Sequence, residues 1–187
     1  MKEIKSAILL FIILTIICGG IYPAVVTGIT SALFPYQSKG SFMTDKNGKE
    51  LGSALIGQPF SDPKYFWPRP SATGDFSYNA MASGGSNAGP TNPDYLKTVG
   101  DRVKKLRDTG MAGQIPADLV QASASGLDPH ITPESAMLQV SRVAKIRGIT
   151  EQKVIKAVQQ ATAGSQMGFL GAPRVNVLVL NLGLDRM

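Results

Sequence analysis

The sequence is poor in the residues that most often build metal centres and covalent cross-links. Its 187 residues include one cysteine, Cys18, and one histidine, His130. A single cysteine excludes an intrachain disulfide. A zinc site needs several cysteine or histidine ligands, so the usual zinc patterns are excluded as well. No pair of carboxylates stands out as an acid–base couple, and the sequence predicts no metal and no tightly bound cofactor.

Charge is absent from one long stretch near the start of the chain. No charged residue occurs between Ser6 and Ser38, although the whole chain carries a formal net charge of +6. The uncharged stretch over residues 7–34 is longer than the about 20 apolar residues that a helix needs to cross a bilayer. Glycine and proline within it are tolerated in spanning helices. We therefore predict a single transmembrane helix over residues 7–34.

The residues before this stretch predict its orientation. Lys2 and Lys5 precede it, and basic residues gather on the cytoplasmic side of membrane spans. We expect a short cytoplasmic N-terminus over residues 1–6 and an extracytoplasmic domain over residues 38–187. The alternative is a signal peptide cleaved near Cys18-Gly19-Gly20. Apolar sequence continues well beyond that point, which favours an uncleaved anchor.

Three helices are predicted in the rest of the chain from their start and stop signals. Each begins at a capping residue followed by apolar residues at helical spacing, and the starts are Asn92-Pro93, Thr132-Pro133 and Thr150. Gly110 and Gly148 end the first two. The inward residues are expected to be Leu96, Val99, Val103 and Leu106, then Met137, Val140, Val143 and Ala144, then Val154, Ile155, Val158 and Ala161.

Few strands are predicted. Residues 51–57 indicate a short strand, and residues 116–123 indicate a short helix. The run "VNVLVLNLGL", residues 175–184, is apolar on both faces, which is typical of a central strand. A polar turn is expected at "DKNGKE", residues 45–50. Together these elements predict a helix-rich α/β or α+β extramembrane domain behind the single transmembrane helix.

Residues 57–93 are unusual in composition. They hold six of the twelve prolines and six of the thirteen aromatic residues. A disordered linker would lack aromatics. This segment is therefore predicted to be an ordered loop, fixed by aromatic side chains that pack on the core.

The end of that loop, "ASGGSNAGPTNP" (residues 82–93), is open to two interpretations. It is either a cradle whose backbone N–H groups bind phosphate, or a tight loop that shapes a surface. A cradle usually lies between a strand and a helix start and often has a lysine. The pattern GxxxxGK[ST] is missing, and no lysine follows until Lys97. A structural turn is therefore favoured.

Two further patterns suggest functions of other classes. Asp128 and His130 lie close together in "LDPHITP" and raise the possibility of a membrane-anchored enzyme, although no serine or cysteine nucleophile occurs in a recognisable elbow. Residues 142–158 read as two helices joined by a Gly-Ile-Thr turn, and Lys145, Arg147, Lys153 and Lys156 add basic charge, a pattern also found in nucleic-acid binders. A membrane anchor makes DNA an awkward partner, so solvated charges on a helical hairpin are favoured and no nucleic-acid partner is expected.

Longer motifs carry a family resemblance. In order along the chain they are a basic N-terminus with one apolar span, "GSALIGQPFSDPKYFWPRPSA", "ASGGSNAGPTNP", "QASASGLDPHITPESAMLQVSRVAKIRG" and "VNVLVLNLGLD". Together they closely resemble the C subunits of the bacterial Kdp high-affinity potassium-transporting ATPase, over nearly the whole chain.

The resemblance implies a role and a set of partners. It implies a single-span accessory subunit of the bacterial inner membrane that is needed for assembly and raises the affinity of the ATPase subunit for ATP. The implied partners are a channel-like potassium-selecting subunit, a P-type ATPase subunit, a very small membrane subunit and the lipid bilayer. The present chain has no DKTG-type phosphorylation site and no P-loop, so it is expected to be non-catalytic and to meet ATP only through the ATPase subunit.

The resemblance also implies site residues. A nucleotide contact would fall on Ser83, Gly84, Gly85 and Gln139. The chain reads SGGSN at the first of these positions, with Asn87 and no glutamine directly after the glycines, which departs from the ABC-transporter signature to which this segment is likened. If the domain is extracytoplasmic, ATP is absent there, and the segment is expected to shape a surface instead. A docking surface is expected around Tyr65, Phe66, Trp67 and Arg69.

Overall fold

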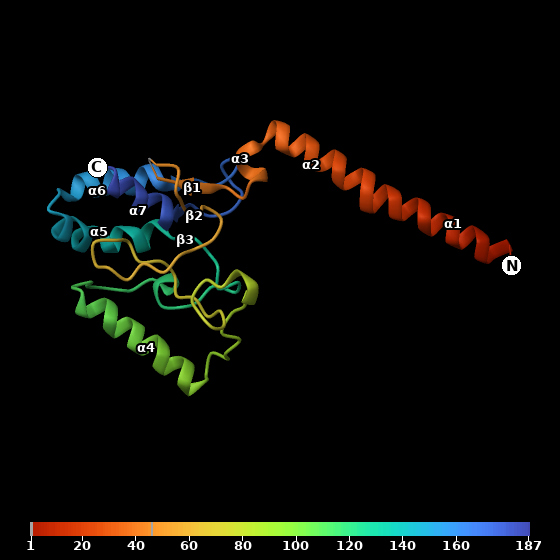
Figure 1. Cartoon of the computed structure of the whole chain (residues 1–187). Coiled ribbons are helices and arrows are strands. Elements are labelled where there is room, and N and C mark those ends of the chain that lie inside the picture. Colours follow the sequence, from red (N-terminus) through yellow and green to blue (C-terminus); the bar gives the residue numbers. More distant parts are fainter. Residues whose placement is uncertain (1, 46) are drawn as a thin grey trace. The chain divides into compact units, whose positions relative to one another are not determined.

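The structure is a computed structural model that describes residues 2–45 and 47–187. Met1, in the predicted cytoplasmic N-terminus, and Lys46, in the predicted turn, lie outside the described residues. The chain divides into two compact units, Met1–Leu51 and Gly52–Met187, and each is described by itself (Figure 1).

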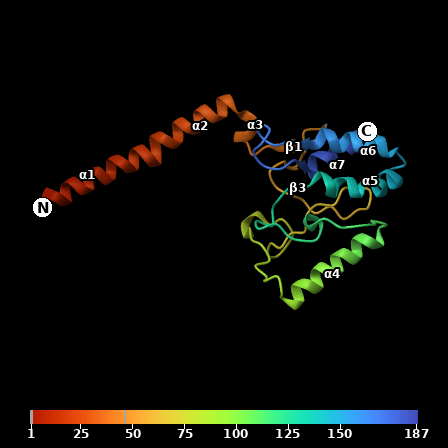
Figure 2. The ribbon, with the colours of Figure 1, turned by 180° about the vertical axis from the view of Figure 1, so that it is seen from behind.

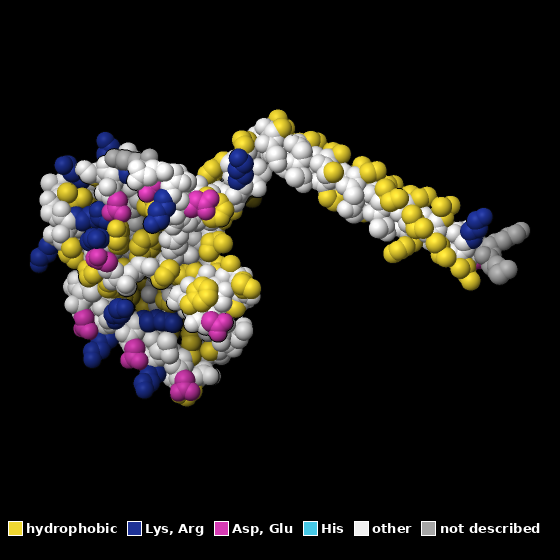
Figure 3. All heavy atoms as spheres, viewed as in Figure 1, with side chains coloured by type: hydrophobic (Ala, Val, Ile, Leu, Met, Phe, Trp, Pro, Cys, Tyr) yellow, Lys and Arg dark blue, Asp and Glu magenta, His cyan; other side chains and the backbone are white. Residues whose placement is uncertain are grey.

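The first unit contains one long apolar helix. It is built from α1 (Lys2–Ile16), a π-helical turn η1 (Ile17–Ile21) and α2 (Tyr22–Leu33). From Glu3 to Leu33 it counts 31 residues with a mean hydropathy of 2.5, and none of its most apolar window is buried. At 1.5 Å per residue such a helix is longer than the about 30 Å of a bilayer's hydrocarbon core. By length and composition it can cross a membrane. Its charged residues, Glu3 and Lys5, lie near its N-terminal end, and the rest of the helix in Figure 3 is yellow and white.

The π-helical turn has a local cause. Pro23 lacks an N–H, and its ring would clash with the carbonyl of Gly19 in a regular helix. The backbone N–H of Tyr22 instead bonds to the Ile17 carbonyl, five residues back. Inserting one such turn relieves the clash while the helix continues.

Short elements follow the long helix. Helix α3 (Pro35–Ser38) precedes β1 (Phe42–Thr44), which pairs with β2 (Glu50–Ser53) in a two-stranded sheet. The predicted polar turn joins these strands, because Asp45 Oδ1 accepts hydrogen bonds from the backbone N–H groups of Asn47 (2.8 Å) and Lys49 (2.9 Å). Strand β2 begins one residue before the predicted strand and ends four residues earlier.

The second unit is helix-rich and α+β. Its main helices are α4 (Pro93–Asp108), α5 (Pro133–Arg147), α6 (Glu151–Ala161) and α7 (Val177–Asp185), with 3-10 turns η2 (Ala80–Ala82) and η3 (Ala117–Leu119). The strands β3 (His130–Ile131), β4 (Thr162–Ala163) and β5 (Arg174–Asn176) form an antiparallel sheet in the order β3-β5-β4. Val175 pairs with both Ile131 and Thr162.

The helices of this unit lie on two sides of a long loop. Figures 1 and 2 agree that α5, α6 and α7 lie together, that α4 lies apart from them, and that the gold part of the loop passes between the two groups. This loop is the predicted ordered segment 57–93, and its only regular element among the described residues is η2.

The predicted starts of the three helices are confirmed. Asn92 Oδ1 accepts from the N–H groups of Asp94 (2.9 Å) and Tyr95 (3.1 Å) at the start of α4. The hydroxyl of Thr132 accepts from the Ser135 N–H (3.1 Å) at the start of α5. Gly148, with φ of 65°, ends α5 in the left-handed conformation that glycine adopts without strain.

The predicted strand over residues 175–184 is wrong beyond its first two residues. Strand β5 ends at Asn176, whose side chain accepts from the Val179 N–H (3.1 Å) and starts helix α7. An apolar run with no alternation fits a buried helix as well as a central strand. The leucines of this run are good helix formers, and the asparagine cap decides for the helix.

The core joins the loop to the helices. Its buried members include Phe66, Trp67 and Leu106 with apolar side chains of α5, α6, β5 and α7. Val140, Val143, Ala144, Val154 and Val158 are buried as predicted. Met137 (45% exposed) and Leu96 (53% exposed) were expected to face inward and do not. The predicted helix over 116–123 is reduced to the 3-10 turn η3.

Candidate functional site

The glycine-rich segment lies against a second loop of the same unit. The Ser83 hydroxyl donates to the Ser125 carbonyl (3.0 Å), and the Gly84 N–H donates to the same oxygen (2.9 Å). A Cβ atom on Gly85 would lie 3.1 Å from the Ala124 carbonyl oxygen. The two backbones therefore approach closely, and the N–H of Gly84 is used inside the protein.

The second loop also requires glycine. Gly126 has φ of +67°, and a Cβ atom there would lie 2.6 Å from the Thr73 methyl and 2.7 Å from the Gly84 carbonyl oxygen. The carbonyl of Gly126 accepts from the Ser71 hydroxyl (2.8 Å). Three segments thus meet at this point, and the glycines are needed because the backbones are so close.

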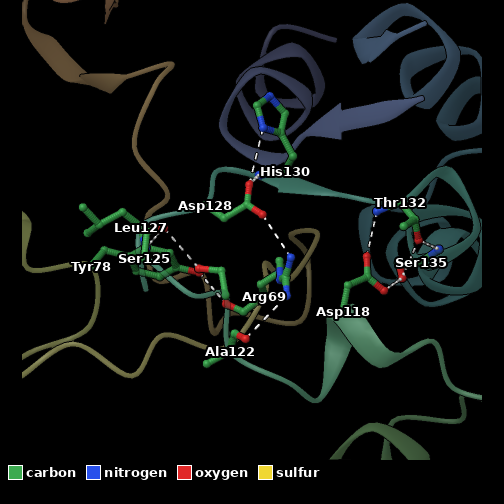
Figure 4. A network of polar contacts seen from close by, with 11 residues as sticks. Arg69, Tyr78, Asp118, Ala122, Ser125, Leu127, Asp128, His130, Thr132 and Ser135 are labelled. Atoms are coloured by element: carbon green, nitrogen blue, oxygen red, sulfur yellow. Dashed lines mark hydrogen bonds and ion pairs between the residues drawn. The ribbon is translucent and has the colours of Figure 1, made fainter. Parts of the chain in front are cut away.

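Arg69, Asp128 and His130 form a chain of polar contacts beside these loops (Figure 4). Arg69 Nη1 lies 3.1 Å from Asp128 Oδ2. Asp128 Oδ1 accepts from the His130 N–H (3.0 Å) and lies 3.5 Å from His130 Nδ1. Burial alone would raise the pKa of the Asp128 carboxyl, but the hydrogen bonds from His130 and the charge of Arg69 outweigh it and the pKa is lowered. The carboxylate therefore stays charged and holds β3 to the loop at Arg69.

Buried hydroxyl groups make further contacts near this chain of polar contacts, and those of Asp118 form a separate group. Tyr78 donates its phenolic hydrogen to the Arg69 carbonyl, and burial raises the pKa of Tyr78. On the far side of the network in Figure 4, Asp118 accepts from the Thr132 N–H (2.7 Å) and from the Ser135 hydroxyl. Within residues 2–45 and 47–187, no hydroxyl or thiol is hydrogen-bonded to the His130 ring and no cluster of metal ligands occurs. The arrangement fixes loops and contains no nucleophile next to a base.

Residues 62–67, called here the pinned segment, are held by side chains from two helices. Asn181 of α7 accepts from the Phe66 N–H (2.8 Å) and donates to the Phe66 carbonyl (3.0 Å). Gln139 of α5 does the same for Trp67, at 2.8 Å and 3.1 Å. Both amides are fully buried. Among the described residues no strand pairs with this loop, so the two side-chain amides satisfy backbone groups that would otherwise be buried without partners. These two amides are called the amide clamp.

Two arginines complete this support. Arg142 donates to the carbonyls of Pro63 and Tyr65 and to Gln139 Oε1 (2.7 Å), and its guanidinium lies 4.3 Å from the centre of the Trp67 ring. Burial lowers the pKa of Arg142 to about 10. Arg147 bonds to the Lys64 carbonyl (2.7 Å) and to Asp185 (2.8 Å). The carbonyls of residues 63–67 thus each accept a hydrogen bond from an arginine or amide side chain.

The predicted docking residues divide into two kinds. Phe66 is fully buried and Trp67 is 9% exposed, so both belong to the core. Tyr65 and Arg69 keep partly exposed side chains. The Tyr65 hydroxyl donates to Asp185 (2.9 Å), and burial raises its pKa. Of the four predicted residues, Tyr65 and Arg69 therefore keep side-chain surface outside the core.

The predicted nucleotide contacts are not brought into one hydrogen-bond network. Ser83 and Gly84 bond to Ser125, whereas Gln139 bonds to Trp67, Ser135 and Arg142. Sequence reasoning missed the roles of Arg142 and Asn181. The available signal was position, since Arg142 follows Gln139 by three residues on one helix and Asn181 interrupts the apolar run of residues 177–184.

A cleft of about 270 Å³ lies between the loop and α4. Its wall contains Arg69, Arg102 and Lys105 and no carboxylate. Arg102 donates to the Val120 carbonyl (2.8 Å), and the Lys105 ammonium lies 5.5 Å from the centre of the Trp67 ring. The cleft is positively charged and partly aromatic.

Comparison with known proteins gives one consistent result. The family model described as "K+-transporting ATPase, c chain" matches residues 4–186. A "Potassium-transporting ATPase KdpC subunit" of Geotalea uraniireducens is 71% identical over 187 residues, which is 100% of this chain and 99% of the relative. Proteins of the same name from Geobacter metallireducens (67% identical, 100% of this chain and 99% of the relative) and Methylococcus capsulatus (52% identical, 100% and 98%) match equally fully.

Proposed function

Because the chain belongs to the family of c chains of the K+-transporting ATPase, the KdpC subunits, we propose that it is a non-catalytic accessory subunit of an ATP-driven potassium uptake complex. It is needed for assembly of the complex and raises the affinity of the ATPase subunit for ATP. Its partners are the channel-like potassium-selecting subunit, the P-type ATPase subunit and the small membrane subunit.

One observation in the second unit carries this proposal. The polar groups that sequence reasoning singled out as candidate chemistry are occupied in holding loops in place. Asp128 binds Arg69, Gln139 and Asn181 bind the pinned segment, and Gly84 binds Ser125. Groups that are held in this way give the domain a fixed surface, which suits a role in binding a partner.

The anchor and the orientation complete the proposal. The helix from Glu3 to Leu33 spans the inner membrane, with Lys2 and Lys5 on the cytoplasmic side. The second unit then lies outside the cytoplasm, where ATP is absent. The effect on ATP affinity is therefore indirect and passes through the partner subunits. Docking uses the surface at Tyr65 and Arg69.

Direct nucleotide contact is the alternative that the family resemblance raises. It would use Ser83, Gly84, Gly85 and Gln139. In the present conformation the Gly84 N–H bonds to Ser125 and Gln139 of α5 is fully buried, so nucleotide binding would require the glycine-rich segment to move and Gln139 to become exposed. This makes the indirect effect the preferred account.

The proposal is tested by comparing complexes purified with and without this chain. Without it we expect a lower yield of assembled complex, and ATP hydrolysis with a higher KM for ATP in the complex that does form. Adding back the full chain should restore the KM. Equal yields and equal KM values in the two preparations would contradict the proposal.

A further inference from the structure

An exposed apolar hairpin joins β4 to β5. It comprises residues 164–171, called here the apolar hairpin. Its tip exposes Met167 (84%), Phe169 (74%) and Leu170 (48%). No charged residue occurs between Lys156 and Arg174. In Figures 1 and 2 the blue trace between α6 and α7 extends beyond the ends of these helices.

The hairpin is ordered by its own backbone. Gln166 and Leu170 exchange two hydrogen bonds, of 2.8 Å and 2.9 Å. The Ser165 hydroxyl donates to the Gly171 carbonyl (2.7 Å). At the tip, Met167 (φ 53°) and Gly168 (φ 84°) adopt left-handed conformations that close the turn. The apolar side chains are therefore presented on a preformed support, although they do not pack in the core.

A preformed apolar tip of this kind suits binding. Ordering a loop on association costs free energy, and a loop that is already ordered avoids this cost. Large apolar side chains, with aromatic residues and methionine prominent among them, form the centres of protein–protein interfaces, from which charge is depleted. The composition of the hairpin matches that description.

The composition also separates a protein partner from a lipid surface. Segments that rest in a membrane interface typically carry tryptophan, tyrosine, lysine or arginine beside their apolar residues. Residues 162–173 contain none of these four residue types. A protein surface that covers Met167, Phe169 and Leu170 fits the hairpin better than a lipid headgroup layer does.

We propose that the apolar hairpin docks into an apolar pocket of another subunit of the same potassium-transporting ATPase, with Phe169 as its anchor. This inference rests on the proposed function in one respect, since it requires that the chain assembles with other subunits. It adds a contact site that is separate from the docking surface at Tyr65 and Arg69.

The contact is tested by photocrosslinking in the assembled complex. A photoreactive benzoyl-phenylalanine replaces Phe169 in the full chain, and the matched control replaces Phe76, which is 64% exposed in a different loop. After irradiation we expect position 169 to give an adduct with the combined mass of this chain and one other subunit of the complex. Position 76 should give no such adduct. An adduct with lipid alone, or none with any subunit, would overturn the inference.

A second measurement shows how much the contact contributes to assembly of the complex. The subunit that crosslinks to position 169 is tagged and purified. Phe169→Asp should reduce the amount of this chain recovered with it at least tenfold, and Phe169→Ala should reduce that amount too. Phe76→Asp should leave recovery unchanged. Unchanged recovery of both Phe169 variants would overturn the inference and leave the proposed function intact, whereas absence of wild-type recovery would overturn both.

Discussion

The pinned segment and the apolar hairpin are both loops rich in large apolar residues, but they are built in opposite ways. The pinned segment, residues 62–67, buries Phe66 and Trp67 and depends on Asn181, Gln139 and Arg142 for its backbone hydrogen bonds. The hairpin closes its own backbone hydrogen bonds and leaves its apolar side chains exposed.

The difference shows how to separate stability from recognition in this protein. Aromatic side chains that are buried together with backbone polar groups need dedicated partners, because an unpaired buried group is costly. Apolar side chains on a self-supporting turn contribute little to folding and are available to a partner. Aromatic content alone therefore does not locate a docking surface. What also matters is whether the loop makes its own backbone hydrogen bonds or depends on side chains from the core.

The largest effect is expected from breaking the amide clamp. Asn181→Ala leaves the N–H and carbonyl of Phe66 buried without partners, at about 1–3 kcal/mol for each group. We expect a loss of about 3 kcal/mol or more in the free energy of unfolding. It can be measured by denaturant titration followed by the fluorescence of Trp67, the only tryptophan in the chain.

Gln152→Ala is the matched control for this variant, because Gln152 is an exposed amide on α6. Its effect should stay within about 0.5 kcal/mol. A loss of less than about 1 kcal/mol for Asn181→Ala would show that the pinned segment does not depend on the clamp.

An intermediate effect is expected where the glycine-rich segment meets residues 123–126. Gly126→Ala places a Cβ atom 2.7 Å from the Gly84 carbonyl oxygen in a left-handed conformation, so we expect a loss of about 2 kcal/mol. Gly164→Ala, at the start of the hairpin, meets nothing within 4 Å and should be nearly neutral. Equal unfolding midpoints for the two variants would argue against close packing of these loops.

The smallest effect on stability is expected at the hairpin tip. Phe169→Ser removes a side chain that is 74% exposed, so the free energy of unfolding of the isolated chain should change by about 0.5 kcal/mol or less. The same denaturant titration measures it. A loss comparable to that of Asn181→Ala would mean that Phe169 belongs to the core, and the contrast between the two loops would fail.

The parts of the fold that were predictable carry local signals. Asn92-Pro93 and Thr132-Pro133 start helices because the caps satisfy N–H groups a few residues away. The long apolar helix follows from composition alone. Residues 177–184 were misread because an apolar run without alternation does not distinguish a strand from a buried helix.

The candidate site was less predictable because its contacts are long-range. Gln139 and Trp67 are 72 residues apart, and Asn181 and Phe66 are 115 apart. No local pattern links such pairs, so Phe66 and Trp67 were predicted to belong to a docking surface and Asn181 to a strand. The order in residues 57–93 was foreseeable from aromatic content, whereas the side chains that enforce it were not.

In the proposed function the second unit lies outside the cytoplasm and affects ATP only through its partners. Its side of the membrane is tested by replacing Cys18 with serine, introducing Gln152→Cys on the exposed face of α6, and treating intact cells with a membrane-impermeant maleimide. If the second unit lies outside, labelling in intact cells should be as strong as in lysed cells. Labelling only after lysis would place the second unit in the cytoplasm, make Ser83, Gly84 and Gly85 accessible to ATP, and contradict the indirect effect on ATP affinity.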